Sequence, residues 1–75
     1  MKIFIKTITG KIISLDIDPN DTIEKIKDKL RIQEGFSFGS FRLCFNGKTL
    51  NNTKTLDFYN IQDENTLLQL SARGN

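Results

Sequence analysis

The chain contains no histidine and no tryptophan, and it has a single cysteine, Cys44, and a single proline, Pro19. One cysteine excludes an internal disulfide, and without histidine neither a Cys–His nucleophile nor a His/Cys metal cluster is available. A nucleophile with its base, a metal site and a phosphate-binding loop cannot be assembled from these residue types. We therefore expect a protein that is not an enzyme and that needs neither cofactor nor metal.

Long apolar runs and a strong excess of one charge are also missing. No apolar run approaches the roughly 18 residues of a membrane span, and no signal peptide opens the chain in this form. The formal net charge is +2, with Lys and Arg interspersed among Asp and Glu, whereas nucleic-acid binders carry strong basic patches. We expect neither a membrane nor a nucleic acid as partner. Localisation stays open between the cytoplasm and secretion after removal of a signal peptide.

The 75 residues fit one domain, residues 1–75, with a modest core. Apolar and polar side chains alternate on both sides of a turn closed by Gly10, which predicts a β-hairpin with one buried face. Further strands are predicted at 41–45, 48–50 and 66–70, with the Asn46-Gly47 turn between the first two and a brief helical turn at 56–59. The apolar positions of the hairpin are Met1, Ile3, Ile5, Ile13, Leu15 and Ile17.

One helix is predicted between the hairpin and the later strands. Asp21 or Thr22 can accept the first unpaired backbone N–H groups, so the helix is expected to begin near Ile23, and Gly35 supplies a left-handed C-terminal cap. A hairpin, a helix and then further strands is an α+β pattern, with one helix packed across a mixed sheet. The buried helix face is formed by Ile23, Ile26 and Leu30.

Beyond this pattern, the chain resembles the ubiquitin family when it is aligned without gaps from Met1. The core positions, the helix caps and the turns all match the family, and this combined agreement is more specific than any short motif. The resemblance implies a ubiquitin-like β-grasp fold, which serves conjugated modifiers and purely recognitional domains alike. The matching stretches are Ile3-Phe4, Lys6-Thr7, Thr9-Gly10-Lys11, Asp21-Thr22-Ile23-Glu24, Glu34-Gly35, Arg42-Leu43, Gly47-Lys48, Thr55-Leu56 and Tyr59-Asn60-Ile61-Gln62.

The tail departs from the family, which joins a terminal Arg-Gly-Gly to other proteins through a channel that admits no side chain. This chain reads Arg73-Gly74-Asn75. One alignment places a deletion near Leu68, and the ungapped one turns Gln69 inward, where an unsatisfied amide costs about 1–3 kcal/mol. This cost favours the deletion, and neither alignment restores Gly-Gly. Asn75 can also mark an arbitrary end or the start of a longer chain.

The resemblance further implies a recognition surface on outward strand positions and the first loop. Cys44 and Leu68 replace a larger branched residue and an imidazole, so we expect weaker binding by standard ubiquitin receptors. A lone cysteine is usually buried, but alternation with Leu43 turns Cys44 outward. If exposed, it could link two copies of an otherwise monomeric protein on oxidation. The surface, which we name the sheet patch, comprises Ile8, Arg42, Cys44, Gly47, Lys48, Leu68 and Leu70.

Lysines that accept further ubiquitins in the family have counterparts here, although lysines are also ordinary surface residues. Two acceptor positions carry Gln33 and Asp63 instead. The acidic partner of Lys27 is replaced by Asn52, so we expect a weaker tether for Lys27 and some loss of stability. The retained positions are Lys6, Lys11, Lys27, Lys29 and Lys48.

Extra phenylalanines appear where the family has prolines, polar or acidic residues. Additional core packing is one interpretation, supported by the inward position of Phe41. The alternative is that Phe36, Phe38 and Phe58 form a second, exposed apolar patch beside Ile8 that binds a partner.

Three functions remain open. The first is a mimic that binds ubiquitin-activating enzyme or ubiquitin-binding domains without being conjugated. The second is a genuine modifier attached through its tail, and the third is a recognition domain of a larger protein.

Overall fold

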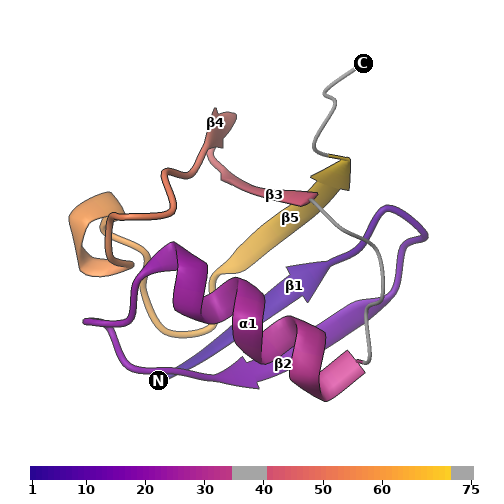
Figure 1. Ribbon diagram of the computed structural model, residues 1–75, viewed down its shortest axis with the longest axis horizontal. Helices are drawn as coiled ribbons and strands as arrows, with labels where there is room; N and C mark the ends of the chain where they lie inside the picture. The colour runs from indigo at the N-terminus through magenta and orange to yellow at the C-terminus, as the bar shows by residue number, and fades with distance from the viewer. Residues whose placement is uncertain (35–40, 72–75) are drawn as a thin grey trace.

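The computed structural model describes residues 1–34 and 41–71, which form a mixed five-stranded sheet with one helix lying across it (Figure 1). This confirms the α+β, ubiquitin-like β-grasp architecture. The helix α1 packs on one face of the sheet, and the short 3-10 helix η1 lies beyond one end of the sheet. The elements are β1 (Lys2–Lys6), β2 (Ile12–Asp16), α1 (Ile23–Glu34), β3 (Phe41–Phe45), β4 (Lys48–Thr49), η1 (Asp57–Tyr59) and β5 (Thr66–Ser71).

The strands lie in the order β2-β1-β5-β3-β4, with β1 and β5 parallel and the other neighbours antiparallel. Ile3 pairs with Leu15 and Ile5 with Ile13, so the alternating apolar residues of the hairpin share one face. All four are buried. Gly10 has φ +89° in the connecting loop, a conformation that costs glycine little. The predicted hairpin is confirmed.

The N-terminus of α1 is capped by Thr22 rather than Asp21. The Thr22 hydroxyl oxygen accepts a hydrogen bond from the backbone N–H of Lys25 at 3.2 Å, the usual N-cap arrangement. Asp21 instead accepts from the backbone N–H of Asp18, three residues earlier, and orders the turn before the helix. The helix begins at Ile23 as expected. Its predicted C-terminal cap, Gly35, lies outside the described residues.

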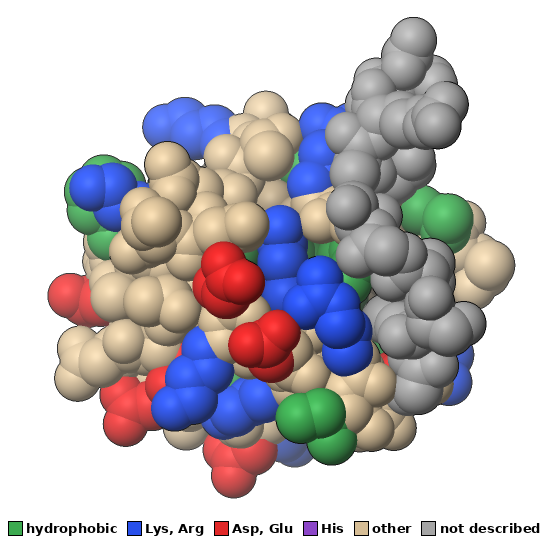
Figure 2. All heavy atoms as spheres, viewed as in Figure 1, with side chains coloured by type: hydrophobic (Ala, Val, Ile, Leu, Met, Phe, Trp, Pro, Cys, Tyr) green, Lys and Arg blue, Asp and Glu red, His purple; other side chains and the backbone are tan. Residues whose placement is uncertain are grey.

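The core is a single cluster between α1 and the inner sheet face. It contains the three predicted helix residues, each with no exposed surface, and Phe41, which points inward as expected. Charged side chains of both signs are intermixed on the visible helix side of the molecule, while hydrophobic ones are scattered (Figure 2). None of the helices in residues 1–34 and 41–71 has the length and apolar character needed to cross a membrane.

Candidate partner-binding surface

Four members of the sheet patch lie on the face of the sheet opposite α1, where strand register brings them together. Across β3 and β5, Arg42 is opposite Leu70 and Cys44 is opposite Leu68. Because alternate residues of a strand share a face, these four side chains are separated from the core-facing Leu43. The face is thus assembled from strands more than twenty residues apart in the chain.

The apolar members of the sheet patch differ in how far they reach solvent. Ile8 is 63% exposed and Leu68 is 43% exposed, whereas Leu70 is half-buried. Gly47 and Lys48 are exposed at the β3–β4 turn, and Arg42 is half-buried and donates to the Thr49 hydroxyl at 3.1 Å. Ile8 and Leu68 therefore form the accessible apolar part of this face.

Cys44 is buried, with 6% of its surface exposed, although it lies on the outward face. Its cross-strand neighbours are Leu68 on one side and Thr49 on the other, and its Sγ is 3.7 Å from the Thr49 Oγ1. A small thiol between larger side chains is shielded even on a solvent-facing surface. The alternative of an exposed Cys44 was wrong, and burial argues against a Cys44-linked dimer.

The position of Gln69 in β5 bears on the choice between the gapped and the ungapped alignment. It faces inward opposite Leu43 and is 4% exposed, the orientation expected from the ungapped alignment in this strand. Its amide is not unsatisfied: the Oε1 atom accepts a hydrogen bond from the backbone N–H of Ile8 at 3.4 Å, and no buried side-chain polar atom in the described part of the chain lacks a partner. The energetic objection to an inward Gln69 was therefore wrong. The contact also ties the Ile8 loop to β5.

The five candidate acceptor lysines occupy very different environments. Lys6 and Lys48 are exposed, and the Nζ of Lys11 is 2.8 Å from the carboxylate of Glu34. Lys29 donates to the carboxylate of Asp21 at 3.2 Å. An isopeptide acceptor must reach an enzyme-bound thioester, and Lys6, Lys11 and Lys48 are the exposed members of the five.

Lys27 is buried between α1 and the sheet. Its residue surface is 8% exposed, and its Nζ lies 5.7 Å from the centroid of the Phe41 ring. Burial lowers its pKa, reinforced by Arg31 and opposed by Glu24. Lys27 has no ion pair with any residue of 1–34 or 41–71. The weaker tether and the loss of stability both stay predictions.

Asp21 holds the turn before α1 and Lys29 together, and we expect Asp21→Asn to lower the free energy of unfolding by about 1–2 kcal/mol at pH 7. Burial alone would raise the pKa of Asp21, but the Asp18 N–H and the Lys29 and Lys25 ammonium groups outweigh it and lower the pKa. Because the folded-state pKa is lowered, this stabilisation is present above an ordinary pKa of about 4 and is lost as the pH falls further.

Urea denaturation across pH 2–7 measures this effect. Asp28→Asn is the matched control, because Asp28 pairs with Arg31 on the surface with its side chain 59% exposed. The control is expected to change stability by less than about 0.5 kcal/mol. A loss in Asp21→Asn that is the same at pH 2.5 and pH 7 would contradict the electrostatic explanation.

Of the proposed second patch, Phe36 and Phe38 lie outside the described residues, as do Arg73, Gly74 and Asn75. Phe58 is 61% exposed. Its helix η1 and the β1–β2 loop that carries Ile8 lie at opposite ends of the molecule (Figure 1), so placing Phe58 beside Ile8 was wrong.

Phe58 instead borders a different surface, which sequence reasoning missed. The ring lies 5.1 Å from that of Tyr59, and the Nζ of Lys54 is 4.7 Å from its centroid. The only sequence signal for this surface was the phenylalanine at an expected solvent-facing turn, since Phe45 and Lys48, which also border the surface, come from β3 and β4.

Comparison with known proteins places this geometry in a family. The Ubiquitin family model matches residues 3–73. The chain belongs to the ubiquitin family. It is 41% identical over 75 residues to ubiquitin-like protein NEDD8 of Dictyostelium discoideum, covering 99% of this chain and 97% of that protein. Ubiquitin-like protein 1 of Schizosaccharomyces pombe is 40% identical over 75 residues, with 99% and 96% covered.

A third relative is much longer than this chain. The UV excision repair protein RAD23 homolog B of Homo sapiens is 31% identical over 76 residues, which cover 97% of this chain but 19% of that protein. The chain is thus a ubiquitin-like protein related to NEDD8-type proteins, and it is also similar to one segment of a longer protein.

Proposed function

We propose that this chain is a non-enzymatic ubiquitin-like protein that binds ubiquitin-activating enzyme or ubiquitin-binding domains through the sheet patch without being conjugated, and so acts as a competitor of ubiquitin. The observation that carries the proposal is the accessible apolar pair Ile8 and Leu68, 63% and 43% exposed on a sheet face flanked by Arg42 and Lys48. Exposed apolar groups with a charged rim are typical of protein-binding surfaces.

The tail sequence supports the absence of conjugation. Neither alignment restores the family's Gly-Gly, because Asn75 follows Gly74, and its side chain is larger than a glycine-selective channel admits. A ubiquitin-like surface joined to such a tail would occupy partners without completing transfer to a lysine.

A covalent modifier is the second candidate. It is favoured by the similarity to NEDD8-type proteins over nearly their whole length. The match to one segment of RAD23 homolog B favours the third, a recognition domain.

An activation assay separates these functions. The chain and its Asn75→Gly variant are each incubated with ubiquitin-activating enzyme and ATP, with and without authentic ubiquitin. We expect no thioester on the enzyme from the unaltered chain, slower charging of ubiquitin in its presence, and thioester formation by Asn75→Gly. Transfer of the unaltered chain to substrate lysines would establish the modifier instead, and absence of any effect by either protein would favour the recognition domain.

A further inference from the structure

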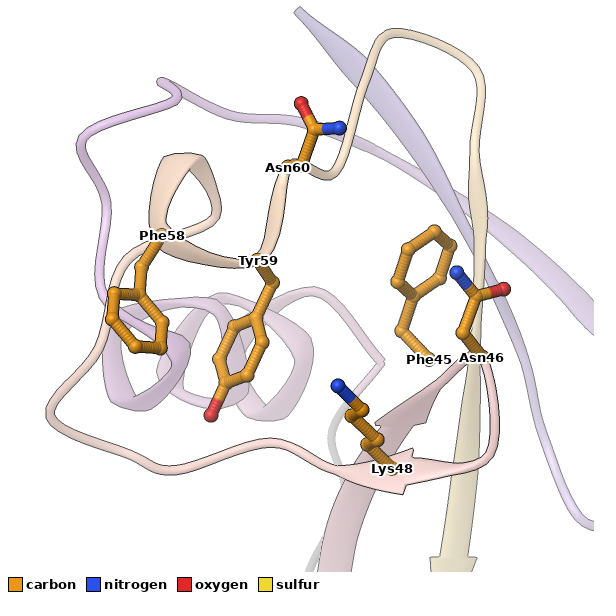
Figure 3. A pocket seen from close by; sticks show the side chains of 6 residues that line it. All are labelled: Phe45, Asn46, Lys48, Phe58, Tyr59 and Asn60. Atoms are coloured by element: carbon orange, nitrogen blue, oxygen red, sulfur yellow. The ribbon is translucent and has the colours of Figure 1, made fainter.

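A groove at the η1 end of the molecule, away from the Ile8 loop, is built from aromatic side chains that are held in place. We name it the aromatic groove. Its cavity of about 250 Å³ is smaller than the roughly 300–1,000 Å³ typical of small-molecule pockets, so it suits a protruding side chain better than a cofactor. It is lined by Phe45, Asn46, Lys48, Phe58, Tyr59 and Asn60 (Figure 3).

The aromatic walls are anchored by contacts beneath them. Phe45 and Tyr59 are partly buried against the core, and the Tyr59 hydroxyl oxygen accepts a hydrogen bond from the backbone N–H of Asn51 at 2.8 Å. The Phe58 ring meets the Tyr59 ring edge to face, with an interplanar angle of 89°. The backbone N–H of Phe58 donates a hydrogen bond to the Thr55 hydroxyl oxygen at 3.1 Å. A partner would therefore meet a surface that is already ordered, which reduces the entropy cost of binding.

The groove carries positive charge that the described residues do not neutralise. Lys48 reaches from β4 into the space between Tyr59 and Phe45 (Figure 3), and Lys54 lies over the Phe58 ring at 4.7 Å. Neither ammonium forms an ion pair within residues 1–34 and 41–71, where the five ion pairs involve other cations. Asp57, which begins η1 and is exposed, is the acidic residue next to Phe58 in the chain, and it forms no ion pair with Lys48 or Lys54.

Aromatic walls and unneutralised ammonium groups select for one kind of occupant. We propose that the aromatic groove binds an acidic peptide segment of a partner protein, in which an aromatic or large aliphatic side chain enters between Phe58, Tyr59 and Phe45 and neighbouring carboxylates pair with Lys48 and Lys54. The apolar side chain is desolvated against the rings, and the carboxylates supply charge complementarity. Asn46 and Asn60, both with positive φ at their turns, also line the groove. Lys48 belongs to both surfaces, but Ile8 and Leu68, which carry the function proposed above, do not line the aromatic groove, so the proposal does not depend on that function.

Titration with short peptides, monitored by NMR of the 15N-labelled chain, tests the proposal. The probe is acetyl-EDFELD-amide, and its matched controls are acetyl-KKFKLK-amide, which reverses the charge, and acetyl-EDSESD-amide, which removes the apolar side chains. We expect the acidic peptide to shift the amide signals of Asn46, Lys48, Phe58 and Asn60. Binding of each control is expected to be at least about fivefold weaker, with affinity for the acidic peptide falling as salt rises.

Variants distinguish the aromatic groove from the sheet patch. Phe58→Ser removes an exposed ring and is expected to weaken binding of the acidic peptide about fivefold or more, with an unchanged fold confirmed by the remaining NMR signals. Leu68→Asp is expected to leave this binding unchanged, because Leu68 does not line the groove. Equal binding of the charge-reversed peptide, shifts confined to Ile8, Leu68 and Leu70, or no shift at all would overturn the proposal.

Discussion

Replacing Leu68 with aspartate is expected to weaken binding of a ubiquitin-binding domain by roughly 30-fold or more, which corresponds to about 2 kcal/mol. Leu68 occupies the centre of the sheet patch, opposite Cys44 across β3 and β5, and 43% of its surface is exposed. A partner that buries this leucine would instead have to desolvate a carboxylate. Isothermal titration calorimetry of both proteins with one domain measures the difference.

The matched control is Ile32→Asp. Ile32 is an apolar residue that is 85% exposed on α1, on the other side of the molecule from the sheet patch. The control should bind like the unaltered chain, and both variants should keep their stability because both positions are open to water. A similar loss in the two variants, or no measurable binding by the unaltered chain, would contradict the proposed role of the sheet patch.

Replacing Gln69 with glutamate is expected to lower the free energy of unfolding by about 3–5 kcal/mol at pH 7. Gln69 is 4% exposed on the inner sheet face opposite Leu43, and the N–H of Ile8 is the donor to its Oε1. An ionised carboxylate there would be desolvated without a cation. Burial should raise the folded-state pKa of the introduced glutamate above its ordinary value of about 4.3.

The sign of the pH dependence follows from that raised pKa. The variant is least destabilised below about pH 4.3, where glutamate is protonated in both states, and it loses stability as the pH rises through the folded-state pKa. Chemical denaturation at pH 4 and pH 7 measures the difference from the unaltered chain at each pH. Gln69→Leu is the control: water can replace Oε1 at the exposed Ile8, so its stability should change by less than about 1 kcal/mol. Equal losses in both variants would contradict the argument.

The helix and the hairpin could be predicted from sequence because local patterns and the global fold agree in them. Ile3 and Ile5 alternate with lysine and phenylalanine on a strand with one buried face, and Thr22 precedes a helix whose apolar residues recur at spacings of three and four. The short strand β4 followed from the Asn46-Gly47 turn. In each case the residues that determine the element lie next to one another in the chain.

Exposure could not be predicted in the same way. Alternation correctly assigned Cys44 to the outward face, but its burial depends on Thr49 and Leu68, which approach it only through strand pairing. The partner of Gln69 is likewise the backbone of Ile8, which is 61 residues away in the chain. A period of two identifies a face of a strand, whereas solvent access depends on the neighbours that cover it.

The sequence by itself determined the α+β fold, the order of its elements and the resemblance to the ubiquitin family, because hydrophobic periodicity, caps and turns are local and mutually consistent. The tertiary structure alone decided which candidate binding side chains are accessible: Leu68 rather than Cys44 on the sheet patch, and Phe58 with Lys48 in a groove distant from Ile8. The physical reason is that binding surfaces are made by side chains from separate elements. Their burial, charge and contacts exist only after long-range pairing has brought them together.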